Sequence, residues 1–180
     1  MKSYKYIEFI LKRKSFPDFI KAVNFKADMK EWTECIAMFF RILHIIKDKK
    51  IDIAFDIGSG KRPTLGAIIS LNIKSINKVV CIDPQLDLSL GKNIKGLTLE
   101  KETLLNYVDK NKSSKFNDVL ICCNHSHVSK KEIYQLMDLC NNWTYITSPC
   151  CIDNKLTDGL YYKDRHIWSP KNEIFTFIGE

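Results

Sequence analysis

Two apolar segments of the chain each end in an aspartate, and the first continues into two closely spaced glycines. Residues 51–57 contain Asp56 and are followed by Gly58-Ser59-Gly60, while residues 79–82 are followed directly by Asp83. Because glycine has no side chain, the backbone N–H groups of such a turn can approach a ligand closely. A carboxylate at the end of the next strand can accept hydrogen bonds from both hydroxyls of a ribose. The spacing therefore predicts a site for a ligand that contains a nucleoside.

Strand-like and helix-like segments alternate from residue 51 onward. We expect strands at 51–57, 79–82, 96–99, 119–123 and 143–147, helices at 63–71, 101–110 and 129–141, a helical turn at 86–90, and a closing antiparallel hairpin formed by 159–168 and 173–178. This alternation is typical of an α/β fold with a mostly parallel sheet and helices on both faces. Ligands of such sheets bind beyond the carboxyl ends of the strands, where the polar residues of this chain are expected to gather.

The segment before the first strand has helical periodicity. Apolar residues recur at spacings of three and four between residues 28 and 48, which predicts an amphipathic helix that packs on the domain or lies over its cleft. Its large rings, Trp32, Phe39 and Phe40, are expected to belong to the core rather than to stack on bases. Residues 1–20 are basic and aromatic, and Pro17 is expected to break any helix there.

Length and charge suggest one domain with a basic end. A chain of 180 residues suits a single domain over 1–180, with 1–50 as a basic helical extension of a core at 51–180. The formal net charge is +7, and residues 1–50 contain 12 Lys and Arg against six Asp and Glu. This surplus indicates an anionic partner such as nucleic acid, or else a solvated lysine-rich face.

The cysteines and the first residues indicate a reducing compartment, either cytoplasmic or nuclear. Four of the seven cysteines form two adjacent pairs, Cys122-Cys123 and Cys150-Cys151, and neighbours on a strand point to opposite faces and rarely bridge. The opening MKSYKYIEFILKRKS lacks the long apolar run of a secretory signal. The most apolar stretch, residues 35–46, is too short and too polar to span a bilayer, so no membrane partner is expected.

Three glycine-rich motifs compete for the turn after the first strand. A P-loop needs G-x-x-x-x-G-K-[ST], but Arg62 follows Gly60-Lys61 and Phe55 stands where the first glycine should be. A dinucleotide fingerprint needs G-x-G-x-x-G/A, and Pro63 occupies its third glycine position. The remaining motif is D-x-G-x-G, which residues 56–60 match. It resembles the corresponding motif of the class I S-adenosylmethionine-dependent methyltransferases.

This resemblance covers about residues 51–179, and it includes Asp83 and the order of five strands followed by a hairpin. It implies a three-layer Rossmann-like methyltransferase fold with a seven-stranded sheet, and S-adenosyl-L-methionine as cofactor. It implies that Asp56 orients the methionyl amino group and that Asp83 binds the ribose hydroxyls. Glu102, or alternatively Glu100, would meet the adenine amino group. The cofactor-binding residues implied by the resemblance are Asp56, Gly58, Ser59, Gly60, Asp83 and Glu102, and Lys61 or Arg62 could face the methionyl carboxylate or a phosphate.

The methyl acceptor of this family is expected near the end of the strand at 119–123. Amino-methylating members often carry [DNS]-P-P-[YFW] there, and this chain has Asn124, followed by His125, Ser126 and His127. The resemblance makes Asn124, His125 and His127 the candidate catalytic residues, with one histidine as a base near neutral pH. An exposed turn before the next helix is the alternative. The spacing of Cys123, His125 and His127 is not that of a typical zinc site, so no metal is expected.

Three functions are compatible with these residues. The first is a methyltransferase acting on nucleic acid, with RNA favoured and the basic residues 1–50 as the substrate platform. The second is a non-catalytic methyltransferase-like subunit that binds or regulates a protein partner, because Arg62 replaces a glycine and the motif after the fourth strand is incomplete. The third is a small-molecule methyltransferase.

Overall fold

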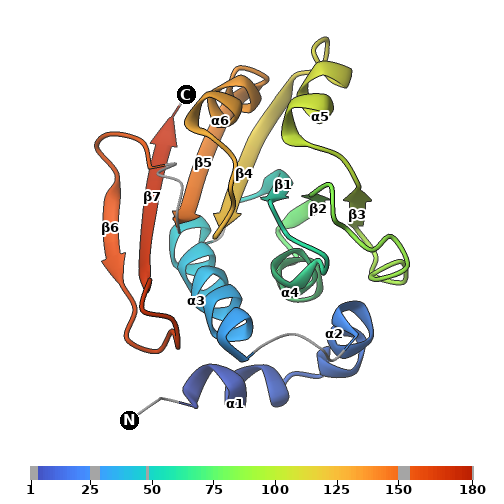
Figure 1. Ribbon diagram of the computed structural model, residues 1–180, viewed down its shortest axis with the longest axis vertical. Helices are drawn as coiled ribbons and strands as arrows, with labels where there is room; N and C mark the ends of the chain where they lie inside the picture. The colour runs from blue at the N-terminus through green and yellow to red at the C-terminus, as the bar shows by residue number, and fades with distance from the viewer. Residues whose placement is uncertain (1–3, 25–28, 48, 150–154, 180) are drawn as a thin grey trace.

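The protein is built around one seven-stranded sheet. A computed structural model describes residues 4–24, 29–47, 49–149 and 155–179. The strands are β1 (Ile51–Ile57), β2 (Ile76–Ile82), β3 (Leu97–Glu100), β4 (Phe116–Asn124), β5 (Cys140–Ser148), β6 (Leu160–Lys163) and β7 (Glu173–Gly179). Their order is β3-β2-β1-β4-β5-β7-β6 (Figure 1). Strands β1 to β5 are parallel, and β7 runs antiparallel to both β5 and β6. The expected mostly parallel sheet with an antiparallel hairpin is confirmed.

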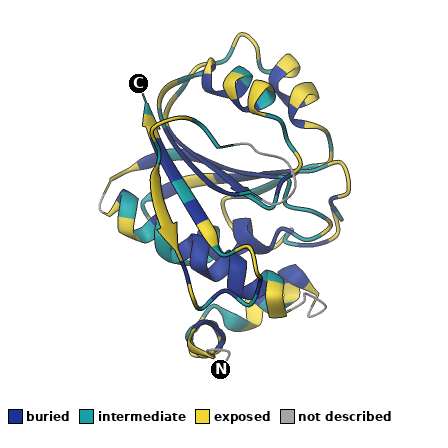
Figure 2. Cartoon of the chain, turned by 60° about the vertical axis from the view of Figure 1, so that its left-hand side comes forward, coloured by how far each residue is buried: buried dark blue, intermediate teal, exposed yellow. Residues whose placement is uncertain are grey.

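Helices cover both faces of the sheet, so the fold has three layers (Figures 1 and 2). One face carries α1 (Lys5–Leu11), α2 (Phe16–Val23), α3 (Met29–Ile46) and α4 (Thr64–Asn72), and the other carries α5 (Leu104–Lys110) and α6 (Lys130–Met137). Successive strand residues contribute to opposite layers, as the pleat requires. Ala54 of β1 belongs to the core under α3 and α4, and its neighbour Phe55 belongs to the core under α5 and α6.

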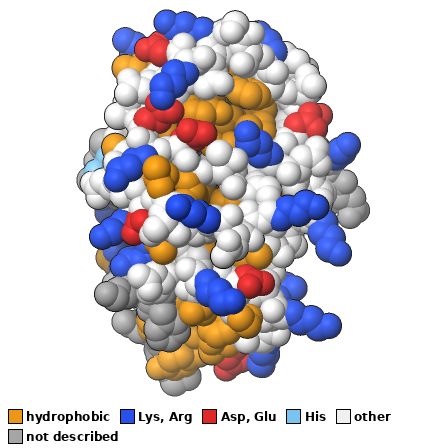
Figure 3. Space-filling model, turned by 90° about the vertical axis from the view of Figure 1, so that its right-hand side faces the viewer, with side chains coloured by type: hydrophobic (Ala, Val, Ile, Leu, Met, Phe, Trp, Pro, Cys, Tyr) orange, Lys and Arg blue, Asp and Glu red, His pale blue; other side chains and the backbone are white. Residues whose placement is uncertain are grey.

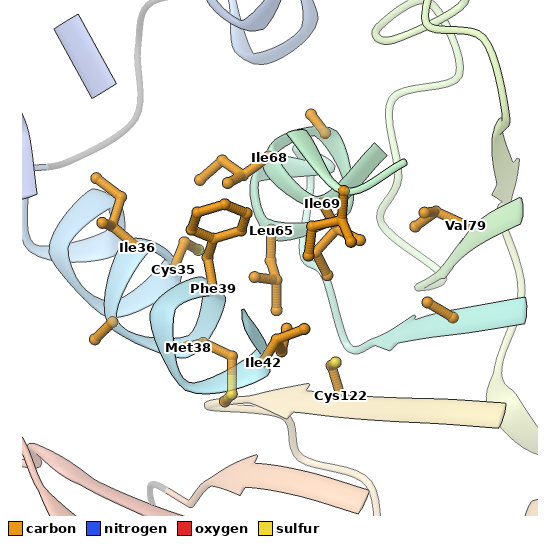
Figure 4. Packing of buried hydrophobic residues seen from close by; sticks show 14 of the residues in the cluster. Cys35, Ile36, Met38, Phe39, Ile42, Leu65, Ile68, Ile69, Val79 and Cys122 are labelled. Carbon is orange, nitrogen blue, oxygen red and sulfur yellow. The ribbon is translucent and has the colours of Figure 1, made fainter. Parts of the chain in front are cut away.

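The α3 helix forms the centre of the first layer. Phe39 of α3 points towards Leu65 and Ile68 of α4 in the close view of Figure 4. Trp32 and Phe39 are 4% and 1% exposed, and the partly buried Phe40 packs against the same cluster. The expectation that these three rings belong to the core is therefore confirmed. The expected end points of this helix, Asp28 and Asp48, lie outside the described residues.

The first two helices pack into the same apolar cluster as α3. Ile10 of α1 and Phe19 and Val23 of α2 are fully or almost fully buried there. Pro17 lies in the first turn of α2, so the expectation that it breaks a helix is wrong. The first turn of a helix has backbone N–H groups without partners inside the helix, and a proline therefore costs little there.

Several elements differ from the expected ones, and specific contacts explain three of these differences. Residues 86–90 form no helix, and 88 and 89 lie in a turn where the Asp87 carboxylate accepts hydrogen bonds from the backbone N–H and the hydroxyl of Ser89. The α6 helix ends at Met137 rather than at residue 141, because Cys140 already pairs with β4. Strand β6 ends at Lys163, and the buried Asp164 turns the chain by accepting the N–H of His166.

Two further expectations concern the cysteines and the membrane. Five cysteines lie in the described part of the chain, and none of them forms a disulfide. The Cys150-Cys151 pair lies outside the described residues. Within the described ranges, no helix has both the length and the apolar composition to cross a membrane.

Candidate functional site: a cleft at the carboxyl edge of the sheet

The glycine turn after β1 is shaped by close packing at one glycine and by open space at the other. Gly58 and Gly60 have φ angles of 69° and 70°, a region that residues with side chains rarely adopt. A Cβ atom added to Gly58 would lie 2.3 Å from the Ser126 hydroxyl oxygen. A Cβ atom added to Gly60 would meet nothing within 4 Å. The main chain at Gly60 therefore faces open space, as a turn that receives a ligand requires.

The Asp83 carboxylate links the end of β2 to this turn. Its Oδ2 atom accepts the Gly60 N–H at 2.9 Å, and its Oδ1 atom accepts the Gln85 N–H at 2.7 Å. Strands β1 and β2 are parallel neighbours, and this register places Asp83 directly beside the glycines. Each carboxylate oxygen has a second lone pair, so Asp83 can still accept hydrogen bonds from a ligand.

Asp56 lies deeper, at the end of β1. Its side chain is 1% exposed, and its Oδ2 atom accepts the Gly66 N–H of α4 at 2.9 Å and the Cys81 thiol at 3.7 Å. Burial raises the pKa of Asp56 to about 7, although these two hydrogen bonds oppose the shift. Asp56 therefore connects β1 to α4, and it gains its full negative charge only above neutral pH.

The end of β4 faces the glycine turn from the other side. The Asn124 Nδ2 group donates to the Cys35 sulfur at 3.4 Å, and its buried Oδ1 atom has no hydrogen-bond partner among the described residues. His125 has a φ angle of 54° and donates its backbone N–H to the Ser148 carbonyl oxygen at 2.9 Å. Its Nε2 atom lies 3.1 Å from Oε1 of Glu34 in α3.

These elements enclose two adjoining cavities that share Gly58, Gly60 and His125. The larger cavity has a volume of about 380 Å³ and lies beside the ends of β2 and β3. The smaller has a volume of about 230 Å³ and lies beneath the first turns of α3. The larger volume is within the usual range of small-molecule sites.

The structure brings all nine predicted site residues to this cleft. Asp56, Gly58, Ser59, Gly60, Asn124 and His125 line the smaller cavity, and Gly58, Gly60, Asp83, Glu102, His125 and His127 line the larger one. Glu102, rather than the alternative Glu100, is part of the lining, and it pairs with Lys110 at 2.5 Å. The roles of these residues remain predictions, as does the orientation of Lys61 and Arg62, which line the smaller cavity.

Sequence reasoning missed two carboxylates in this cleft, Glu31 and Glu34 of α3. Both line the smaller cavity, and Glu34 is buried. They lie three residues apart and therefore share a helix face. A signal was present in the sequence, because Glu34 interrupts the otherwise apolar face that contains Cys35. That signal does not indicate which part of the sheet the carboxylate meets.

Comparison with known proteins shows that this chain resembles them in its fold. No family model matches the chain, and no curated protein matches its sequence. Among solved structures, a variant of MtNAS in complex with S-adenosylmethionine aligns at a TM-score of 0.54 and 10% identity, covering 97% of this chain and 70% of that one. Together with the strand order, this settles the architecture. The chain has the class I methyltransferase fold.

Two other solved structures align with lower TM-scores. A cyclopropane-fatty-acyl-phospholipid synthase-like protein from Lactobacillus casei ATCC 334 has a TM-score of 0.45 and 15% identity. The alignment covers 81% of this chain but only 58% of that protein. The protein SMU.1697c from Streptococcus mutans, solved in complex with SAH, has a TM-score of 0.45 and 12% identity, with 77% and 94% of the two chains covered.

Proposed function

We propose that this protein is an S-adenosylmethionine-dependent methyltransferase with a small-molecule acceptor. The observation that carries the proposal is the single cleft where the open glycine turn, Asp83 and the end of β4 meet. Methyl transfer from a sulfonium depends mainly on proximity and alignment, and a cleft with preformed walls supplies both. S-adenosylmethionine would supply the activated methyl group.

The residues present fit this cofactor. In the larger cavity, Asp83 would accept hydrogen bonds from the ribose, and Glu102 would face the adenine. The unsatisfied Oδ1 atom of Asn124 is a polar group that a bound ligand would complete, and a ligand has room beside the main chain at Gly60. In the smaller cavity, Asp56 would act on the methionyl amino group directly or through water.

The charge of the smaller cavity favours a small acceptor over RNA. The buried Glu34 and the partly buried Glu31 line it, with the cationic Lys61 and Arg62 towards its rim, and the inner carboxylates repel the phosphates of a nucleic acid. On the face seen in Figure 3, Lys and Arg side chains are spread out with acidic side chains among them, rather than gathered in one patch. RNA binding through residues 1–50 remains a prediction, with salt-sensitive affinity for an RNA oligonucleotide as its test.

Cofactor binding is the first test. Calorimetry should detect S-adenosylmethionine and S-adenosylhomocysteine, and Asp83→Ala should weaken the affinity by about tenfold or more, because it removes the proposed ribose contact. Asp87→Ala is the matched control, since that carboxylate accepts hydrogen bonds from the nearby Ser89 and does not line either cavity. Folded protein that gives no heat at millimolar ligand would rule out the methyltransferase proposal.

Turnover is the second test, and it separates an enzyme from a non-catalytic subunit. Methyl-labelled S-adenosylmethionine should transfer its label to a component of a metabolite extract. Ligand binding without transfer to metabolites, RNA, DNA or protein would favour the binding or regulatory subunit instead. Transfer to the RNA pool alone would favour the nucleic-acid enzyme.

A further inference from the structure

The smaller cavity has an acidic wall that the proposed cofactor contacts do not explain. The Glu34 side chain is 7% exposed, and it lies 3.1 Å from the His125 ring and 3.8 Å from the Lys30 ammonium. The Glu31 carboxylate accepts the Thr64 hydroxyl at 2.6 Å. A carboxylate buried this deeply is costly unless cations or hydrogen-bond donors offset its charge.

The cationic groups around this wall lie mostly towards solvent. Lys30 is about half exposed, and Lys61 at the rim of the cavity is exposed. Arg62 lines the same rim and is partly buried. Glu34 and Asp56 are among the buried lining residues of the cavity, together with Cys35, Thr64 and Leu65. Its inner surface therefore suits a ligand that brings a positive charge.

His125 is held in an unusual conformation beside this wall. A positive φ angle in a residue other than glycine costs about 1 kcal/mol or more, and it persists only where the surroundings enforce it. Here the backbone bond to Ser148 holds the turn at the end of β4, and the ring contacts Glu34 across the cavity wall. A basic side chain thus lies within the cleft, in contact with the Glu34 carboxylate.

We propose that the methyl acceptor is a small primary or secondary amine. It enters the smaller cavity as an ammonium, which Glu34 and Glu31 bind, and it loses a proton to the pair formed by His125 and Glu34. This inference rests on the proposed function and specifies its acceptor.

The chemistry balances with these residues. An ammonium nitrogen has no lone pair, so one proton must leave it before transfer, and the pair of His125 and Glu34 is positioned to receive that proton. The nitrogen lone pair then forms the new N–C bond, and the electrons of the broken S–C bond stay on sulfur, giving S-adenosylhomocysteine. The proton passes to solvent, which regenerates the site.

Binding to protein saturated with S-adenosylhomocysteine tests the inference without relying on turnover. Phenethylamine and butylamine are the probes, and phenethyl alcohol and butanol are their uncharged counterparts. Calorimetry should show amine binding that is about tenfold or more tighter than alcohol binding, because only the ammonium gains from the carboxylates. Label from S-adenosylmethionine should then appear on the amine nitrogen.

Variants identify which carboxylate binds the amine. Glu34→Gln should weaken amine binding by about tenfold or more and leave S-adenosylhomocysteine affinity within a factor of about three. Glu8→Gln, at an exposed position of α1, is the matched control and should change neither affinity. If circular dichroism shows that Glu34→Gln does not fold, Glu31→Gln replaces it, because that partly exposed side chain is less important for packing.

The outcomes distinguish failure of the inference from failure of the proposed function. If S-adenosylhomocysteine does not bind, the proposed function fails and the inference fails with it. If it binds, but amines bind no better than alcohols or not at all, only the inference is overturned. The same holds if Glu34→Gln weakens S-adenosylhomocysteine and amine equally, because Glu34 would then serve the cofactor.

Discussion

Asp56 has one role in the fold and a second, proposed role in the site. Its carboxylate receives the Gly66 N–H, which fixes the start of α4 against β1. The same side chain lines the smaller cavity, where a cationic ligand group would favour its ionised form. Because burial raises the pKa of Asp56 to about 7, ligand binding near neutral pH should be coupled to proton release.

The first prediction concerns stability and pH at this residue. The folded pKa of about 7 lies above the ordinary value of 3.8, so the folded state retains a proton that the unfolded chain has already lost. This favourable contribution to stability is complete below about pH 4 and is lost as the pH rises through 7. Asp56→Asn removes the ionisation.

Between pH 5 and pH 8, the free energy of unfolding of Asp56→Asn should therefore rise by about 2–3 kcal/mol relative to the unmodified protein. Urea unfolding at the two pH values measures this difference, and Asp118→Asn, at an exposed position of β4, is the control. Parallel pH profiles for Asp56→Asn and the unmodified protein would contradict the prediction.

The two glycines of the turn give a second prediction. Gly58→Ala places a methyl group against the Ser126 side chain in a strained conformation, and we expect a loss of about 2–4 kcal/mol of stability. Gly60→Ala meets only open space, and the strain alone should cost about 1 kcal/mol. Thermal unfolding compares the two variants, and equal losses would mean that Gly58 is not closely packed.

At the scale of elements, local sequence patterns specified most strands and one helix start. The S-x-x-E pattern at Ser129 and Glu132 predicts a capping box, and the structure contains both of its hydrogen bonds. The apolar run that predicted β4 is buried on both faces of the sheet. The ends of α6 and β6 could not be read in this way, because pairing with distant strands decides where they stop.

The capping box gives the third prediction. Ser129→Ala removes the oxygen that accepts the Glu132 N–H, and the free energy of unfolding should fall by about 1 kcal/mol. Chemical denaturation measures this loss, with Ser113→Ala in an exposed turn as the control. An unchanged midpoint would show that solvent replaces the lost acceptor without cost.

At the scale of the whole molecule, the basic N-terminal helices are joined to the sheet by apolar packing. Ile10, Phe19 and Val23 lie in the cluster that also contains α3, α4 and several strands. A chain that begins at residue 29 would expose this surface, and we expect it to lose several kcal/mol of stability or to remain unfolded. Circular dichroism and limited proteolysis provide the measurement.

A charge-reversal variant separates packing from charge at this end of the molecule. Lys12→Glu, Lys14→Glu and Lys21→Glu together change only exposed side chains, and the folded state should persist. If residues 1–50 serve as an RNA platform, this variant should also lose its salt-sensitive RNA affinity. If the chain that begins at residue 29 is as stable as the full chain, then apolar packing of the first two helices does not stabilise the fold.

The sequence alone determined the glycine turn and the placement of Asp56 and Asp83 at neighbouring strand ends. These features follow from local apolar runs and from the rule that parallel strands end at a common edge. Only the tertiary structure decided that Glu34 meets His125, 91 residues further along the chain. That contact depends on how α3 docks across the sheet, and docking is set by the packing of side chains from many elements, which no local spacing encodes.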